Sequence, residues 1–272
     1  MEVIVTPTPE SAASAAARAV LSGLPAGNGP VLGLATGSSP LGLYAELAAA
    51  AAAGRVDFSA ATGFALDEYV GLPAGHVQSY RQVLIREVCD VIGLPLAGLN
   101  VPDGTGATQA ELEAGAAAYD AAIRAAGGVD VQILGIGANG HVGFNEPGSS
   151  LSSRTRLKRL TSRTRRDNAR FFDNDADVPT HCITQGLGTV LDARRLVLIA
   201  TGAAKAAAIA AAVEGPLAAS CPGSILQWHA DAVVVLDEAA AAGLSNREYY
   251  DDAARGLELT PWQGADRFVR RL

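Results

Sequence analysis

The residues best suited to chemistry lie in the stretch GIGANGHVGFNEP, residues 135–147. It follows a run of β-forming residues and places three polar side chains, Asn139, His141 and Glu146, among closely spaced glycines. A lone histidine is more often structural, but a histidine in a glycine-rich loop after a strand favours a functional role. The ordinary pKa of imidazole, near ~6.5, suits proton transfer at neutral pH. The stretch predicts an acid–base site in which Glu146 orients His141 or balances its charge.

A second candidate is the carboxylate pair Asp67 and Glu68 in ALDEYVGLP. Neighbouring residues of an extended segment point to opposite sides, so at most one of the pair should face a cleft. Burial raises the pKa of a carboxyl group toward working pH, and Asp67 could then act as a general base. The alternative is a solvated pair that ends a strand.

A phosphate site is indicated by ATGSSP, residues 35–40. Gly37 permits a tight turn, Ser39 can cap the following helix, and Pro40 suits its first position. Such a turn presents free amides and the positive end of a helix to an anion. An ordinary capped turn is the alternative interpretation.

Cations that could reach a bound anion are few. Lys158 and Lys205 are the only lysines, and Lys205 follows the end of a predicted strand. Arg170 lies in a polar segment from which it could fold over the anion. A denser cluster is either a second anion site or a solvated face; it comprises Arg154, Arg156, Lys158 and Arg159.

The hydrophobic pattern predicts the elements that must position these residues. Strands are expected at 3–7, 30–36, 62–67, 129–137, 195–202 and 231–238, and helices at 9–22, 40–53, 79–92, 108–126, 162–172, 203–213 and 239–254. Because the strands are almost continuously apolar and alternate with helices, we expect an α/β fold: a doubly wound, Rossmann-like, mostly parallel sheet flanked by helices. Ligands bind such sheets at the carboxyl ends of the strands.

Length and composition limit the remaining choices. The 272 residues are expected to form a single domain, with the polar segment 150–180 as a mobile lid. A net charge of −7 argues against nucleic acid or an anionic membrane as the partner. Three cysteines without a C-x-x-C pair suggest neither a disulfide framework nor a metal site. With no signal peptide or membrane helix in the pattern, a soluble cytoplasmic protein is expected.

The chain resembles the glucosamine-6-phosphate deaminase family. The resemblance runs in order from about residue 30 to 240 through ATGSSP, LDEYVGL, GIGANGHVGFNEPGSS, SRTR, NARFFDND and AAVEGP. It implies conversion of glucosamine 6-phosphate and water to fructose 6-phosphate and ammonium. It also implies an α/β fold around a parallel sheet and no metal or organic cofactor.

The resemblance assigns roles to the candidate residues. Asp67 would move the C2 proton of the sugar to C1, and His141 would open the pyranose ring with the help of Asn139 and Glu146. The phosphate would be held by Thr36, Gly37, Ser38, Ser39, Arg170 and Lys205. Ring opening must come first, because only the open-chain aldehyde has an acidified C2 proton.

Asn139 stands where some members of the family carry Asp. A neighbouring Asp would favour the imidazolium form of His141, whereas Asn can only orient the ring by hydrogen bonding. We therefore predict that His141 depends mainly on Glu146 for its charge.

The same family includes hexamers activated by N-acetylglucosamine 6-phosphate as well as simpler forms without regulation. Arg156 and Lys158 match basic residues of the allosteric site, which with Ser149 and Ser150 would form that site here. A homo-oligomer, hexameric in the regulated form, is the expected assembly. Either Tyr249 or Tyr250 could take the part of the regulatory aromatic residue.

Two other functions are compatible with parts of the pattern. A 6-phosphogluconolactonase-like hydrolase shares a related fold and glycine–histidine loop, but DEYVGL and FNEPGSS favour the deaminase. A sugar-phosphate-binding regulator without catalysis would not need Asp67, His141 and Glu146 together.

Overall fold

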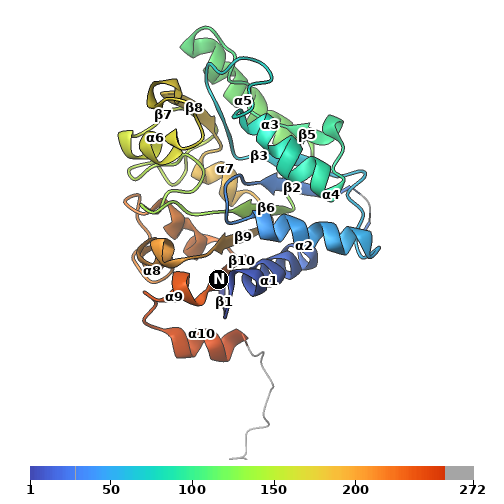
Figure 1. Cartoon of the computed structure of the whole chain (residues 1–272), viewed down its shortest axis with the longest axis vertical. Helices are drawn as coiled ribbons and strands as arrows, with labels where there is room; N and C mark the ends of the chain where they lie inside the picture. Colours follow the sequence, from blue (N-terminus) through green and yellow to red (C-terminus); the bar gives the residue numbers. More distant parts are fainter. Residues whose placement is uncertain (28, 255–272) are drawn as a thin grey trace, which may run out of the picture.

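A seven-stranded parallel sheet forms the centre of the computed structural model, which describes residues 1–27 and 29–254 (Figure 1). Every neighbouring pair of strands is parallel. In spatial order the strands are β1 (Glu2–Thr6), β10 (Ala232–Asp237), β9 (Arg195–Ala200), β6 (Val131–Leu134), β2 (Val31–Leu34), β3 (Thr62–Ala65) and β5 (Leu99–Asn100). This arrangement confirms the predicted α/β class. The rest of the predicted 1–272 domain lies outside the described residues.

The order of the strands reverses between β2 and β6. From β2 the chain continues outward to β3 and β5, and it then returns to β6 on the other side of β2 before adding β9 and β10. Doubly wound sheets bind ligands at such a reversal, outside the carboxyl ends of the two strands. The two loops singled out for phosphate binding and acid–base chemistry follow β2 and β6.

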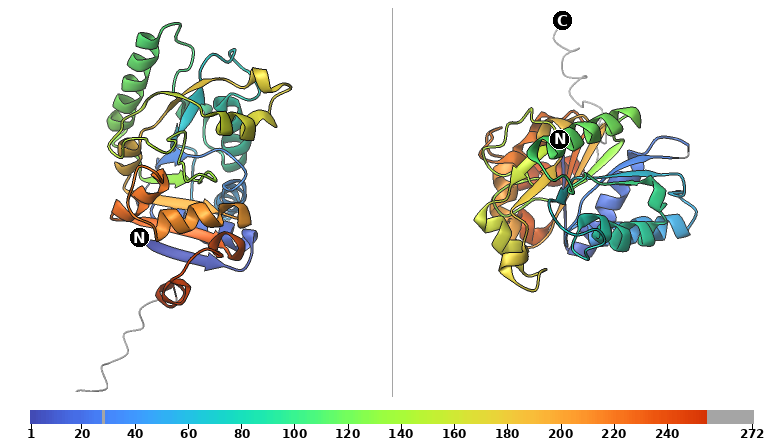
Figure 2. Two further views of the ribbon diagram at one scale, coloured as in Figure 1. Left: turned by 90° about the vertical axis from the view of Figure 1, so that its left-hand side faces the viewer. Right: turned by 90° about the horizontal axis from the view of Figure 1, so that it is seen from above.

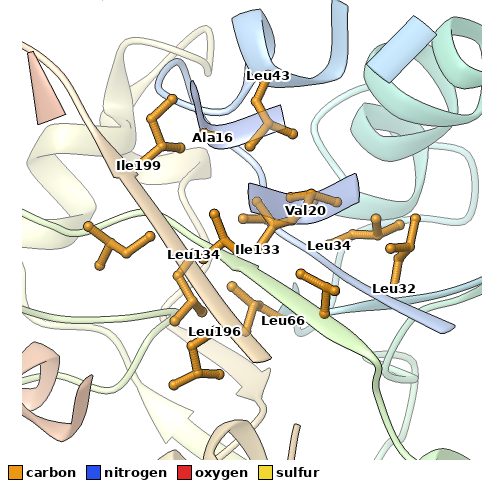
Figure 3. Packing of buried hydrophobic residues seen from close by; sticks show 14 of the residues in the cluster. Ala16, Val20, Leu32, Leu34, Leu43, Leu66, Ile133, Leu134, Leu196 and Ile199 are labelled. Atoms are coloured by element: carbon orange, nitrogen blue, oxygen red, sulfur yellow. The ribbon is translucent and has the colours of Figure 1, made fainter. Parts of the chain in front are cut away.

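Helices cover both faces of the sheet (Figure 2). They are α1 (Pro9–Ser22), α2 (Leu41–Ala52), α3 (Tyr80–Leu84), α4 (Asp90–Ile92), α5 (Gln109–Ala125), α6 (Ser162–Ala169), α7 (Leu187–Leu191), α8 (Ala206–Val213), α9 (Glu238–Ala241) and α10 (Arg247–Ala254). The buried face of α1 is mostly alanine, which lets the helix pack closely on the strands. Figure 3 shows Val20 of α1 and Leu43 of α2 gathered over the strands that carry Ile133 and Ile199. Within the described residues, no helix has the length and apolar character needed to cross a membrane.

A second, antiparallel sheet corrects the prediction of one strand at 62–67. The chain leaves the parallel sheet after Ala65 and begins a new strand, β4 (Asp67–Tyr69). β4 pairs with β8 (His181–Thr184), which pairs with β7 (Arg156–Arg159). The pattern missed β7 and β8 because they are short, and β7 carries three cations. Tertiary packing selects them: Leu157 and Ile183 belong to an apolar cluster with Leu112 of α5.

Three predicted helices are also interrupted. The segment 79–92 contains a π-helical turn at Ile85–Cys89 between α3 and α4. The segment 203–213 begins with a 3₁₀ turn, Ala203–Lys205, before α8. The segment 239–254 breaks between α9 and α10, where the Glu214 carboxylate accepts the amides of Ser245 and Asn246 at 2.8 Å each.

Candidate active site

The loop after β6 is a tight turn that brings its histidine back over its own backbone. The Gly137 amide donates to the His141 carbonyl at 2.9 Å, and the Gly140 amide donates to the Gly137 carbonyl at 2.9 Å. Gly140 has φ +84°, a conformation that favours glycine. A Cβ on Gly137 would overlap the imidazole of His141. The close spacing of glycines therefore fixes where the imidazole lies.

His141, Asn139 and Glu146 meet as the resemblance implies. The Asn139 side-chain amide donates to Glu146 Oε2 at 2.8 Å, while Asn139 Oδ1 accepts the His141 backbone amide at 3.2 Å. His141 Nδ1 lies 3.7 Å from the same Oε2 atom. This distance is too long for a hydrogen bond. Asn139 has thus taken the position on Glu146 that His141 would otherwise use.

Burial and charge act against each other on His141, whose side chain is 22% exposed. Burial lowers the pKa of His141, and the negative charge of Glu146 only partly opposes this effect. The positive charge of Lys205 lowers the pKa further. The imidazole is therefore neutral at pH 7, a form that can both accept and donate a proton. Glu146 is the charge that most favours the imidazolium form, but the effect of burial on the pKa of His141 is larger.

Glu146 remains ionised although its side chain is only 6% exposed. Burial raises its pKa, but hydrogen bonds from Thr164 and Asn139, with the nearby His141, bring the net pKa below the ordinary value. The Thr161 hydroxyl also donates to Oε1, at 3.1 Å, and that of Thr164 makes a shorter bond to the same oxygen. The sequence interpretation missed both threonines. The available signal was their spacing at the start of a helix, with Thr161 as N-cap and Thr164 three residues later.

Asp67 is buried at the first position of β4, with 7% of the residue exposed. Burial, reinforced by the charge of Glu68, raises the pKa of Asp67 to about 8. Its Oδ2 lies 3.3 Å from where a Cβ on Gly143 would stand, so this carboxyl group adjoins the loop that carries His141. A carboxyl group with a pKa this high can exchange protons near neutral pH.

Glu68 points the other way, as strand alternation requires. Its carboxylate accepts the amides of Tyr69, Tyr80 and Arg81 at 2.8 to 2.9 Å. Two of these amides belong to the first turn of α3, so Glu68 satisfies a helix end that would otherwise be left unpaired. Its role is structural.

The loop after β2 has unused hydrogen-bonding groups. Gly37 adopts φ +100°, as the tight turn requires. The prediction that Ser39 caps the helix is wrong: α2 begins at Leu41, with Pro40 at the N-cap and no side-chain cap. In the described part of the chain, no side-chain hydrogen bond forms at Thr36, Ser38 or Ser39. Their hydroxyls therefore remain available to a ligand beside the positive end of α2.

Two predicted cations lie near this edge of the sheet. Lys205 Nζ donates to the carbonyl of Ile136, in the histidine loop, at 2.6 Å. Burial and the positive charge of Arg170 lower the pKa of Lys205. Arg170 itself is exposed, with its guanidinium 4.7 Å from the ring centre of Phe171. The two cations are therefore close enough to interact electrostatically.

The basic cluster divides by role. Arg154 pairs with buried Asp120 at 3.0 Å and with Asp192 at 2.6 Å, which makes it structural. Arg156 donates to Asn145 Oδ1 at 2.9 Å. Ser149 is 3% exposed, and its hydroxyl has no hydrogen-bond partner within the described structure. Ser150 is exposed and bonds to Ser152.

Residues 1–27 and 29–254 contain no group of three or more His, Cys, Asp or Glu side chains arranged to hold a metal ion. The site as built consists of acid–base groups and anion-binding groups.

Comparison with known proteins identifies relatives along most of the chain. A family model for glucosamine-6-phosphate isomerases/6-phosphogluconolactonase matches residues 7–235. A glucosamine-6-phosphate deaminase of Pseudarthrobacter chlorophenolicus is 60% identical over 220 residues, 81% of this chain and 83% of the relative. One from Streptomyces coelicolor is 53% identical over 265 residues, 97% and 100% of the two chains.

Solved structures show the same likeness. A structure described as a monomeric glucosamine-6-phosphate deaminase has a TM-score of 0.84 and 35% identity, and the match covers 89% of this chain and 100% of that one. A 6-phosphogluconolactonase from Trypanosoma cruzi has a TM-score of 0.69 at 19% identity, with 90% and 97% covered. The second likeness concerns the fold alone.

Replacing Asp67 should show how much the burial of its carboxyl group lowers the stability of the folded protein. The folded protein holds a proton on Asp67 up to about pH 8, whereas the unfolded chain releases it near the ordinary value. The contribution of this group to stability therefore falls as pH rises from about 4 to about 8. The free energy of unfolding of Asp67→Asn should rise relative to that of the wild type by about 5 kcal/mol across that range. Urea unfolding at several pH values measures the difference. Asp90→Asn, which removes an exposed carboxylate, is the matched control. A constant difference for Asp67→Asn would refute the assignment.

Replacing Asn139 should test what sets the charge of His141. Asn139→Asp removes a donor to Glu146 and places a second carboxylate beside the imidazole, so the pKa of His141 should rise by about one unit. Titration of the imidazole resonances by NMR measures it, with His141→Gln to assign the signal. The remote variant Asn246→Asp provides the same charge change as a control. An unchanged His141 pKa in Asn139→Asp would count against the proposed balance.

Proposed function

The chain belongs to the family of glucosamine-6-phosphate isomerases and 6-phosphogluconolactonases, and we propose that within it the chain is a glucosamine-6-phosphate deaminase. It is an enzyme that converts glucosamine 6-phosphate and water to fructose 6-phosphate and ammonium. The observation that carries this proposal is that a buried carboxyl group, Asp67, lies against the loop that bears the neutral His141. An isomerising deamination needs one group to move a proton between C2 and C1 and a second group to move a proton to the ring oxygen.

Phosphate binding fixes the sugar in the site. The unpaired hydroxyls and amides of residues 36–39, with the nearby Arg170 and Lys205, supply the donors. Holding the phosphate fixes C1, C2 and the ring oxygen in one geometry relative to the acid–base groups. The reacting atoms are therefore already close and oriented when proton transfer begins.

Ring opening falls to His141. A neutral imidazole accepts the proton of the C1 hydroxyl and delivers it to the ring oxygen, so the C1–O bond to the ring breaks and the aldehyde forms. The ionised Glu146 stabilises the transient imidazolium, and Asn139 holds Glu146 in place.

Proton transfer between carbons falls to Asp67. The carboxylate removes the C2 proton of the aldehyde and returns it to C1, while the ammonium group on C2 gives up a proton and the C1 oxygen gains one. This leaves an alcohol at C1 and a protonated imine at C2. Water adds to this imine and ammonium leaves, giving the ketone. Asp67 must be ionised at the start, and the positive amino group on C2 of the substrate favours that form by lowering its pKa.

The two alternatives make different demands on the site. A lactone hydrolase needs no base for a C–H bond, whereas Asp67 is buried against the loop that bears His141. A sugar-phosphate-binding regulator has no use for acid–base groups with pKa values displaced in this manner.

Regulation, assembly and the lid remain predictions. Ser149, Ser150, Arg156 and Lys158 would take the phosphate of N-acetylglucosamine 6-phosphate in a homo-oligomer, and the unpaired Ser149 hydroxyl is consistent with this. Tyr249 and Tyr250 lie on α10, at the opposite end of the molecule from β7 (Figure 1). Neither can therefore complete that site within one chain. The proposed lid contains β7 and α6, so part of it is ordered into the small sheet.

Ammonium release tests the function. The wild-type protein should release ammonium from glucosamine 6-phosphate, and Asp67→Asn should be slower by about 10²-fold or more because it lacks the base. Asp90→Asn controls for a mere loss of carboxylate. Hydrolysis of 6-phosphogluconolactone without ammonium release would favour the lactonase, and binding of the amino sugar without turnover would favour the regulator.

Rate curves with and without N-acetylglucosamine 6-phosphate test regulation. The acetylated sugar should lower the substrate concentration that gives half-maximal rate, and Lys158→Ala should remove this effect. Arg159→Ala is the control, since its side chain lies on the opposite face of the same strand. A hyperbolic curve that the acetylated sugar does not change would exclude regulation.

A further inference from the structure

Helix α6 contacts the catalytic region at several points. Its N-cap residue, Thr161, and Thr164 in its first turn both donate to Glu146. In its last turn, the Asn168 side chain donates to the Tyr69 hydroxyl at 2.9 Å, two residues from Asp67. Arg170, in the proposed phosphate clamp, is its C-cap. One short helix therefore links the ring-opening groups, the strand of the base and the phosphate clamp.

Thr164 is the only buried side chain of α6 and is 3% exposed. A buried polar residue needs a hydrogen-bond partner, and that of Thr164 is the Glu146 carboxylate. Glu146 thus receives three donors, one from its own loop and two from α6. A protonated carboxyl group could not accept all three equally, so the donors favour the ionised form.

We propose, resting on the deaminase function above, that Thr164 is a positioning residue that holds Glu146 ionised, with Oε1 bonded to α6 and Oε2 left to Asn139 beside His141. Its hydroxyl acts through Glu146 and does not touch the sugar. Because the same helix ends at Arg170, a phosphate held by that arginine also holds the donors of Glu146 in place. Helix α6 therefore couples phosphate binding at Arg170 to the ionisation of Glu146.

The other charged groups near the pair are accounted for. Lys205, Arg163 and Asp167 act on His141 from the turn before α8 and from α6. Cys182 on β8 also faces this region, and burial raises the pKa of its thiol well above the ordinary range. None of these groups changes when only the hydroxyl of Thr164 is removed.

Thr164→Val removes the hydroxyl and keeps the shape, while Thr164→Ser keeps the hydroxyl. NMR titration of the Glu146 carboxyl in the full-length protein should show its pKa raised by about one unit in Thr164→Val. Thr164→Ser should titrate like the wild type. In ammonium release, Thr164→Val should lose about 10-fold in kcat with KM little changed, because the phosphate clamp is intact.

Equal titration of Thr164→Val and wild type would overturn the proposal, and so would an equal loss in Thr164→Ser, which would indicate packing. If Thr164→Val does not fold, Thr161→Val removes the other hydroxyl donor and should shift the pKa of Glu146 in the same direction; no shift there would also overturn it. The titration needs no turnover, so a wild-type protein that releases no ammonium would refute the function without deciding the role of Thr164.

Discussion

Two carboxyl groups buried to nearly the same degree govern this site, and the supply of hydrogen-bond donors separates them. Glu146 receives an amide and two hydroxyls and stays ionised. Asp67 has no side-chain hydrogen bond within the described residues, and burial beside Glu68 raises its pKa to about 8. Burial destabilises the charged form of both groups, but only the Glu146 carboxylate receives hydrogen bonds that compensate for this loss of solvation. One group is thereby kept as a fixed charge and the other as a proton carrier.

The fold places Asp67 on a strand and His141 on a loop. Asp67 is the first residue of β4 and is held by pairing with Thr184 of β8. His141 lies on a loop whose shape is set by Gly137 and Gly140. The base that must reach two adjacent carbon atoms is therefore on a strand, whereas the group that serves two oxygens is on a turn.

Much of this could be predicted from the sequence. Alternating apolar runs and helices predicted the parallel sheet, and the rule that ligands bind at strand ends selected the loops after β2 and β6. The antiparallel sheet could not be predicted, because β7 is selected by the packing of Leu157 against α5 rather than by its own composition. Thr161 and Thr164 were missed for a similar reason. Their contact with Glu146 depends on how α6 is docked, and a threonine pair at a helix start is normally only a cap.

The outer position of β7 has a consequence of its own. β7 is an edge strand of the small sheet, and one of its sides has no strand partner in the described structure. An open edge is a template on which other chains can aggregate, and charged side chains are a common defence. With Arg156, Lys158 and Arg159 among its four residues, β7 would place like charges against any copy that tried to extend the sheet. These cations protect the enzyme from self-association through that edge whether or not a sugar phosphate ever binds them.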